Sequence, residues 1–193
     1  SRINLWRTDL DGSNPKQLTT ADTDTWFDLS PVGGWVVYTS RESGVSKLFK
    51  VSLEGGSPVP LYDSPVSKPA ISPDGKLIAC LSSASPASQR QVILLPFEGG
   101  TPVKALESNF AHGNATSLHW TPDGRALLYV DGRQGSSNIW RLPIDGSAAQ
   151  PATNFNDAKL ERIVSFDISR DGKQLIIARG SPNADVVLIS EVK

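Results

Sequence analysis

The sequence predicts an all-β fold built from a repeated four-stranded antiparallel unit, because two short motifs recur with the same period. The first motif is a small hydroxyl residue, a tight turn that contains glycine, and an apolar run. Its four copies lie 42, 49 and 48 residues apart and begin at Ser30, Ser72, Thr121 and Ser169. The second motif is an apolar residue followed by Asp or Glu and then Gly. Its copies lie 43, 44 and 47 residues apart and begin at Leu10, Leu53, Phe97 and Ile144. Together the motifs indicate a repeat of about 45 residues.

Each repeat contains four short apolar runs, which we expect to be strands. In the block of residues 107–154 these runs are 116–120, 126–130, 138–144 and 150–153. Asp-Gly pairs between such runs favour tight hairpins, because glycine readily adopts a positive φ and aspartate tolerates it. No segment shows the sustained 3.6-residue period of an amphipathic helix. We therefore expect antiparallel strands joined in chain order.

The repeat divides the chain into five blocks. Three of them are complete four-stranded units, at residues 21–62, 63–106 and 107–154. The incomplete blocks are residues 1–20, with strands expected at 3–10 and 15–19, and residues 155–193, with strands expected at 163–168, 173–178 and 186–192. The chain begins at Ser1 and contains no methionine. We expect it to be the C-terminal part of a larger ring of about six to eight units, and we expect the open edges to favour self-association.

Four-stranded units of this length, repeated along a chain, are typical of the blades of a β-propeller. The turn Ser/Thr-Pro-Asp-Gly at Ser72 and Thr121, followed by an apolar strand and a second strand that ends in Asp/Glu-Gly, resembles the TolB-like propeller family of WD-like repeats. This resemblance covers nearly the whole chain, although residues 30–34 and 169–172 depart from the pattern. It implies a β-propeller segment, and it leaves the activity open because propellers host many functions.

The end of the chain carries a narrower resemblance. Residues 166–173, 179–181 and 185–189 resemble the C-terminal propellers attached to bacterial Ser/Thr protein kinases or to CadC-like winged-helix regulators. This implies a sensory or protein-interaction domain whose signalling chemistry lies on another domain. In such proteins a membrane span commonly separates the two domains, which favours a periplasmic or extracytoplasmic location over a cytoplasmic one.

Composition excludes several classes of function. The chain has 19 basic and 20 acidic residues and a formal net charge of -1, which argues against nucleic-acid binding by this segment. No apolar run approaches the roughly 18 residues of a membrane span. The single cysteine, Cys80, excludes an internal disulfide framework. Because Cys80 shares its repeat position with Tyr38 and Tyr129, we expect a packed strand residue and not a reactive thiol.

Motifs for catalysis are absent from the sequence, so we expect a protein that is not an enzyme and binds no cofactor or metal. There is no Gly-x-Ser-x-Gly elbow, Walker loop, His-Glu-x-x-His motif or kinase catalytic loop. His112 and His119 lack a paired carboxylate pattern, and the Asp-Gly pairs lack the dense spacing of a calcium loop. The repeated tryptophans are expected to pack within and between blades, Trp6 and Trp140 in one repeat position and Trp26 and Trp120 on the first strands; stacking on a ligand is the alternative.

One edge of the repeat is the predicted binding face. The short turns within the motifs all fall on one face, so the longer and more variable connections share the opposite face, where recognition residues usually lie. The candidate ligand- or partner-binding residues there are Arg41, Glu42, Arg90, His112, Arg133, Arg162 and Arg179. Two interpretations remain open: the arginines bond to blade carbonyls and neighbouring carboxylates, or they bind an anionic ligand or a peptide.

The sequence therefore favours a non-catalytic scaffold for a protein or peptide partner, as the sensory or interaction domain of a larger bacterial signalling protein. Two alternatives stay open. One is the accessory propeller of a prolyl oligopeptidase-like hydrolase, and the other is a TolB-type envelope component that binds another protein.

Overall fold

The computed structural model describes residues 2–20, 23–82, 91–107, 117–131, 137–156 and 162–180. In these residues the secondary structure consists of 16 strands and no helices, which confirms the predicted all-β class. Three four-stranded sheets contain neighbouring strands that are consecutive in the chain and antiparallel. Two-stranded sheets flank them at either end of the described chain. The predicted strand at 186–192 lies outside the described residues.

The strands follow the repeat in order. The first sheet pairs β1 (Trp6–Arg7) with β2 (Lys16–Gln17). The next contains β3 (Asp24–Leu29), β4 (Trp35–Glu42), β5 (Val45–Ser52) and β6 (Val59–Tyr62). The third contains β7 (Val66–Ile71), β8 (Leu77–Ser82), β9 (Gln91–Pro96) and β10 (Lys104–Glu107). The fourth contains β11 (Leu118–Trp120), β12 (Ala126–Asp131), β13 (Asn138–Pro143) and β14 (Gln150–Pro151). The last pairs β15 (Arg162–Ile168) with β16 (Leu175–Gly180).

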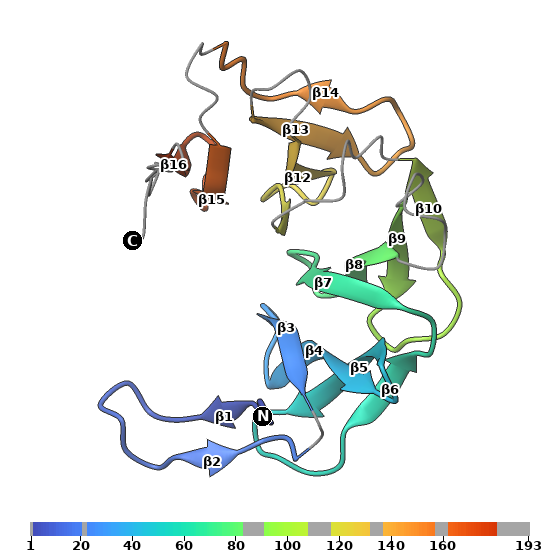
Figure 1. The fold of residues 1–193 in the computed structure, drawn as a ribbon, viewed down its shortest axis with the longest axis vertical. Coiled ribbons are helices and arrows are strands. Elements are labelled where there is room, and N and C mark those ends of the chain that lie inside the picture. The colour runs from blue at the N-terminus through green and yellow to red at the C-terminus, as the bar shows by residue number, and fades with distance from the viewer. Residues whose placement is uncertain are drawn as a thin grey trace, which may run out of the picture.

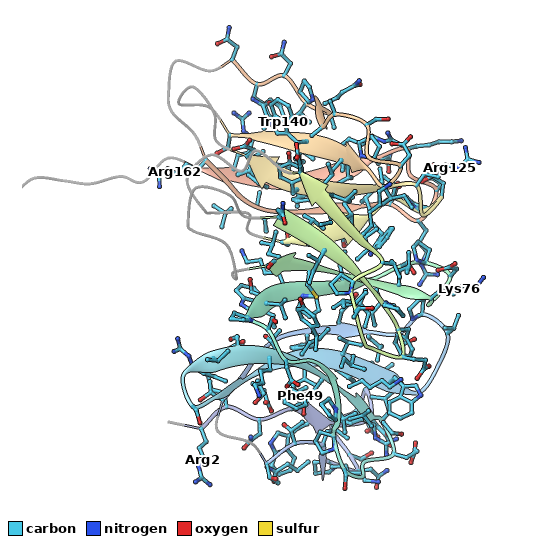
Figure 2. All side chains as sticks on the ribbon, turned by 90° about the vertical axis from the view of Figure 1, so that its right-hand side faces the viewer. Arg2, Phe49, Lys76, Arg125, Trp140 and Arg162 are labelled. Carbon is cyan, nitrogen blue, oxygen red and sulfur yellow. The ribbon has the colours of Figure 1, made fainter. Side chains whose placement is uncertain are left out.

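The five sheets stand side by side along an arc, as blades around a common centre (Figure 1). The first strand of each four-stranded blade lies on the inner side of the arc and the last strand lies on the outer side. Viewed from the side, the arc has two faces (Figure 2). Lys76 and Arg125, on the short turns of the first motif, project at one face, and Arg162 lies at the opposite face. The short turns at Lys76 and Arg125 therefore lie on the face opposite the start of β15.

The first motif is a turn closed by its own side chains. Ser72 donates its hydroxyl to Asp74 Oδ1 at 2.6 Å, and the same carboxylate oxygen accepts the backbone N–H of Lys76 at 3.1 Å. Gly75 adopts φ = +70°, which a residue with a side chain rarely does. The same bonds recur at Thr121 and Asp123 and at the copy that begins at Ser169. These three copies of the first motif are thus hairpin turns held by the same side-chain hydrogen bonds.

The hydrophobic core lies between neighbouring blades as a series of separate layers. One layer joins the β3–β6 blade to the β7–β10 blade, and it contains Cys80 with no exposed surface. Burial without a charged partner raises the pKa of the Cys80 thiol far above its usual range. The prediction that Cys80 is a packed strand residue is therefore confirmed.

The tryptophans behave differently from one another. Trp140 packs half-buried against the layer between its own blade and the preceding one. The packing expected for Trp6 is wrong, since its side chain is 60% exposed. The equivalent residues Phe49 and Ile93 face the sheet that precedes their own in the chain. No strand precedes Trp6 in the described residues, so it has no such neighbour.

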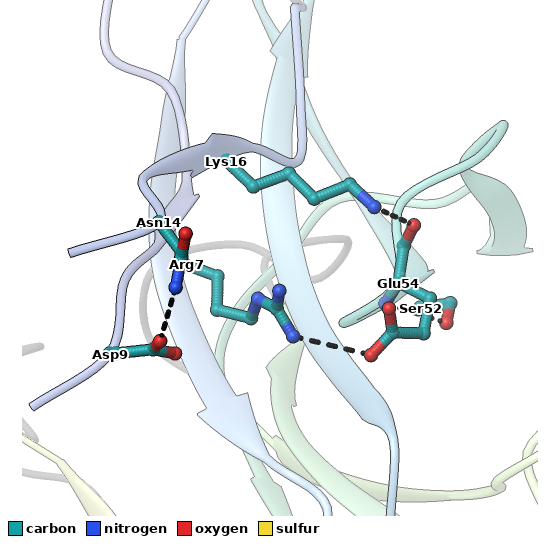
Figure 3. A network of polar contacts seen from close by, with 6 residues as sticks. All are labelled: Arg7, Asp9, Asn14, Lys16, Ser52 and Glu54. Carbon is teal, nitrogen blue, oxygen red and sulfur yellow. Dashed lines mark hydrogen bonds and ion pairs between the residues drawn. The ribbon is translucent and has the colours of Figure 1, made fainter.

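Lysines link the first four blades to one another at the face of the short turns. Lys16 on β2 donates to the backbone carbonyl of Glu54 in the following blade, and Arg7 pairs with the Glu54 carboxylate at 3.2 Å (Figure 3). Lys104 on β10 repeats the arrangement and donates to the carbonyl of Ile144 at 2.7 Å. At the interface between the β3–β6 and β7–β10 blades, the buried Lys50 contacts the Glu98 carboxylate at 2.5 Å. These contacts join neighbouring blades through polar side chains.

Candidate functional site

The residues of the predicted binding face come from several strands, and three of them lie outside the described residues: Arg90, His112 and Arg133. Glu42 ends β4. Arg41 is exposed and donates its Nε–H to the carbonyl of Gly44 in its own turn at 3.3 Å. The Arg179 guanidinium lies over the Phe155 ring, 4.1 Å from its centroid, and Arg162 is exposed at the start of β15. Binding of a ligand at this face stays a prediction.

The inner side of the arc brings together aromatic, acidic and basic side chains. There the first strands of four blades line an open cavity of about 390 Å³. Its walls include Trp26 and Asp28 from β3, Lys68 from β7, His119 from β11 and Asp167 from β15. We call this the inner cavity. Side chains from four different blades therefore meet at one site.

Asp28, His119 and Asp167 occupy the same position in three repeats, two residues before the Ser or Thr that opens the turn. His119 Nδ1 lies 3.5 Å from Asp167 Oδ1 in the next blade, and the His119 ring packs against Phe166 with 4.7 Å between ring centroids. His119 Nε2 lies 3.1 Å from the Ser117 hydroxyl. Asp28 points to the neighbouring blade and accepts the backbone N–H of Ile71 at 2.7 Å.

Burial shifts the pKa values of two side chains in this cluster, Asp28 and His119. Desolvation raises the pKa of the Asp28 carboxyl, although the N–H groups of Ile71 and Leu29 and the nearby His119 act in the opposite direction. Desolvation also lowers the pKa of His119 below its usual range, against the attraction of Asp167 and Asp28. The His119 imidazole is therefore neutral at pH 7, so the charged groups of the cavity are two carboxylates and the Lys68 ammonium.

A bulge positions the lysine. β7 pairs irregularly with β8 between Ser67 and Ala70, and Lys68 within that interval adopts φ = +55°. Bulges commonly re-aim a side chain next to a functional site. Here the Lys68 ammonium lies 5.0 Å from the centroid of the Trp26 ring, in the geometry of a cation–π contact. β3 also has an irregular pairing, between Asp24 and Phe27, immediately beside Trp26.

The wall formed by β3 exposes apolar surface inside the cavity. Trp26 is 47% exposed, Phe27 63% and Leu29 56%. All three line the inner cavity. Aromatic residues beside a few fixed polar groups are typical of sites that bind ligands or peptides. The prediction that Trp26 packs as a core residue is therefore wrong.

The cavity has the groups for binding and orientation. Within the described part of the chain, no group of three or more His, Cys, Asp or Glu is arranged to hold a metal ion. That part also has no helix of the length and apolar character needed to span a membrane. The sequence pattern places the predicted recognition residues at the loop face, and it favours neither a catalytic nor a metal-binding role for His119. Aligning the position two residues before each turn would have revealed Asp28, His119 and Asp167 as a recurring polar set.

Comparison with known proteins identifies the fold family. Residues 8–193 match the family described as "PD40: TolB beta propeller domain". The Tol-Pal system protein TolB of Bordetella pertussis is 29% identical over 150 residues, which are 77% of this chain and 34% of that protein. Dipeptidyl-peptidase 5 of Aspergillus fumigatus is 26% identical over 152 residues, which are 68% of this chain and 21% of the relative.

A solved structure shows the same architecture. The crystal structure of TolB from Acinetobacter baumannii superposes with a TM-score of 0.76 at 20% identity, and the match covers 94% of this chain and 44% of that one. The chain spans less than half the length of the first curated relatives that it matches. These matches, together with the four-stranded blades, show that the chain belongs to the TolB β-propeller domain family.

Proposed function

We propose that this propeller segment is a non-catalytic binding module that recognises a peptide segment of a protein partner in its inner cavity. The observation that carries the proposal is the convergence of four blades on one cavity that combines exposed aromatic surface with fixed charges. An extended peptide fits such a site, because its side chains can contact Trp26 and Phe27 while Asp28, Lys68 and Asp167 select charge.

Binding also agrees with what the chain resembles. TolB, a Tol-Pal system protein, is among its relatives, and we propose that the present chain works through contacts with another protein. A sensory or interaction role within a larger bacterial signalling protein, joined to a kinase or a winged-helix domain, is the finer form of this proposal. It rests on the resemblance of the C-terminal residues.

A second candidate is an accessory propeller that admits peptides to a peptidase domain. The similarity to dipeptidyl-peptidase 5 favours it, as does 33% identity over 124 residues to tricorn protease homolog 1 of Streptomyces coelicolor. A Gly-x-Ser-x-Gly motif in coding sequence adjoining these residues would support this candidate. A kinase or winged-helix domain there would support the first.

Selection from a random peptide library on the immobilised chain tests the binding function. Selected peptides are then titrated calorimetrically against the wild type, Trp26→Ala and the matched control Trp6→Ala, whose tryptophan is also exposed but does not line the cavity. We expect Trp26→Ala to weaken binding by about tenfold or more and Trp6→Ala to leave it within about twofold. Equal effects of the two substitutions, or no selected peptide, would contradict the proposal.

A further inference from the structure

The charges of the inner cavity do not balance. Its charged lining residues are Asp28, Asp167 and Lys68, beside the neutral His119. Among the described residues, no lysine or arginine forms an ion pair with either carboxylate. The Lys68 ammonium lies over the Trp26 ring. The cavity therefore has one more negative than positive charge, and partial burial of Asp28 and His119 reduces screening by solvent at that part of it.

Both carboxylates can accept further hydrogen bonds. Asp28 accepts one backbone N–H at each oxygen, from Leu29 at 2.9 Å and from Ile71 at 2.7 Å. Asp167 accepts the N–H of Ile168 at 2.8 Å, and its side chain is 78% exposed. An ionised carboxylate has about four lone-pair sites, so both residues can accept further donors. Because Asp28 is held by a neighbouring blade, its carboxylate is oriented before a ligand arrives.

We propose that the inner cavity recognises a basic residue of the bound peptide, with an arginine side chain donating to Asp28 and Asp167. This inference rests on the proposed function and names the chemistry of its partner. A guanidinium suits the site better than an ammonium, because its planar donors can reach two carboxylates and its flat face can stack on an aromatic ring. Trp26 and Phe27 offer exposed rings in the same cavity.

His119 gives the site a pH dependence. It lies beside Asp167 and within the electrostatic reach of Asp28, while Lys68 on β7 supplies the remaining charge of the cavity. Protonation of His119 at low pH adds a positive charge between the groups that hold the guanidinium, and protonation of Asp28 removes a negative one. Both changes disfavour a cation, so binding of a basic peptide weakens as the pH falls from neutrality through the lowered pKa of His119.

The test uses peptides selected on the whole chain at about pH 7.5, each compared with a copy in which arginine is replaced by citrulline, its uncharged analogue of the same shape. We expect the replacement to weaken binding about tenfold. Asp167→Asn should give a similar loss. Asp63→Asn is the matched control, since it removes the same charge from an exposed residue at the outer end of a blade, and it should change the affinity by less than about twofold.

The outcomes separate the two proposals. At about pH 5 the arginine peptide should bind more weakly than at pH 7.5, and His119→Gln should reduce that difference. Peptides that depend on Trp26 but tolerate citrulline and Asp167→Asn would overturn the arginine inference and leave the binding function standing. If no selected peptide depends on Trp26, both proposals fall.

Discussion

Trp120 on β11 donates its indole Nε1–H to the backbone carbonyl of Ala70 on β7, at 2.9 Å. The side chain is buried, so this bond joins two blades in a region closed to water. The next residue of β7 takes part in a second link, because the N–H of Ile71 donates to Asp28 on β3. The inner strand β7 is therefore tied to both neighbouring blades beside the cavity.

Replacing Trp120 by phenylalanine should destabilise the protein. The substitution keeps an aromatic ring in the core layer but leaves the buried Ala70 carbonyl without its indole donor, at a cost of about 1–3 kcal/mol. Chemical denaturation measures this as a lower midpoint. Trp26→Phe is the control, since Trp26 is half exposed, and it should change the free energy of unfolding by less than about 0.5 kcal/mol. An equal loss in the two variants would show that the bond to Ala70 contributes nothing.

Lys104→Met should loosen the contact between the blades of β10 and β13. Methionine keeps most of the apolar stem but cannot donate to the Ile144 carbonyl, so the expected loss is about 1.5 kcal/mol. Lys76→Met is the matched control, because the Lys76 side chain is 80% exposed and contacts Asp74 only at 3.8 Å. It should change stability by less than about 0.5 kcal/mol. Thermal unfolding of both variants distinguishes a blade link from a general effect of lost charge.

Two adjacent glycines allow a sharp test of blade packing. Gly99 and Gly100 both have positive φ, at +86° and +100°. A Cβ at Gly99 would lie 2.8 Å from the carbonyl oxygen of Leu61 in the preceding blade, whereas a Cβ at Gly100 would meet nothing within 4 Å. Gly100→Ala should cost about 1–2 kcal/mol through backbone strain alone. Gly99→Ala should cost at least about 1 kcal/mol more because backbone must move. Equal losses would contradict this packing.

The carboxylates of the turns make the stability of the fold depend on pH. The hydroxyl of Thr121, followed by the N–H of Arg125, holds the pKa of Asp123 below its usual value. The pKa of Asp123 is thus lower in the folded state than in the unfolded state. The stabilisation is complete above the unfolded value of about 4 and disappears as the pH falls through the folded value.

The wild type should therefore unfold at a higher temperature than Asp123→Asn at pH 7, and the gap should close toward about pH 2. Melting curves recorded across this range check the expectation. A difference in melting temperature that stays constant with pH would mean that the charge of Asp123 does not stabilise the turn.

Much of the fold could be predicted from the sequence because the repeat is local. The turn that begins at Ser72 needs only neighbouring side chains and one glycine, so its sequence pattern is sufficient. The burial of Cys80 follows from its place in an apolar strand. The exposure of Trp6 could not be predicted, because it depends on whether another sheet packs on that side.

The candidate site was harder to predict because it forms between blades. His119 and Asp167 lie 48 residues apart in the sequence and meet only when two blades pack. The position of Lys68 over Trp26 depends on a bulge in β7 that no turn motif marks. Polar residues in strands were therefore overlooked in favour of charged residues in loops.

The most direct test of the account is to locate a bound peptide by NMR. The chain has five tryptophans, so it gives five indole N–H signals, which single substitutions assign. Titration with a selected peptide should shift the Trp26 signal in proportion to occupancy and leave that of Trp6 in place, because Trp26 lines the inner cavity and Trp6 does not. A peptide that binds without moving the Trp26 signal would contradict recognition in the cavity.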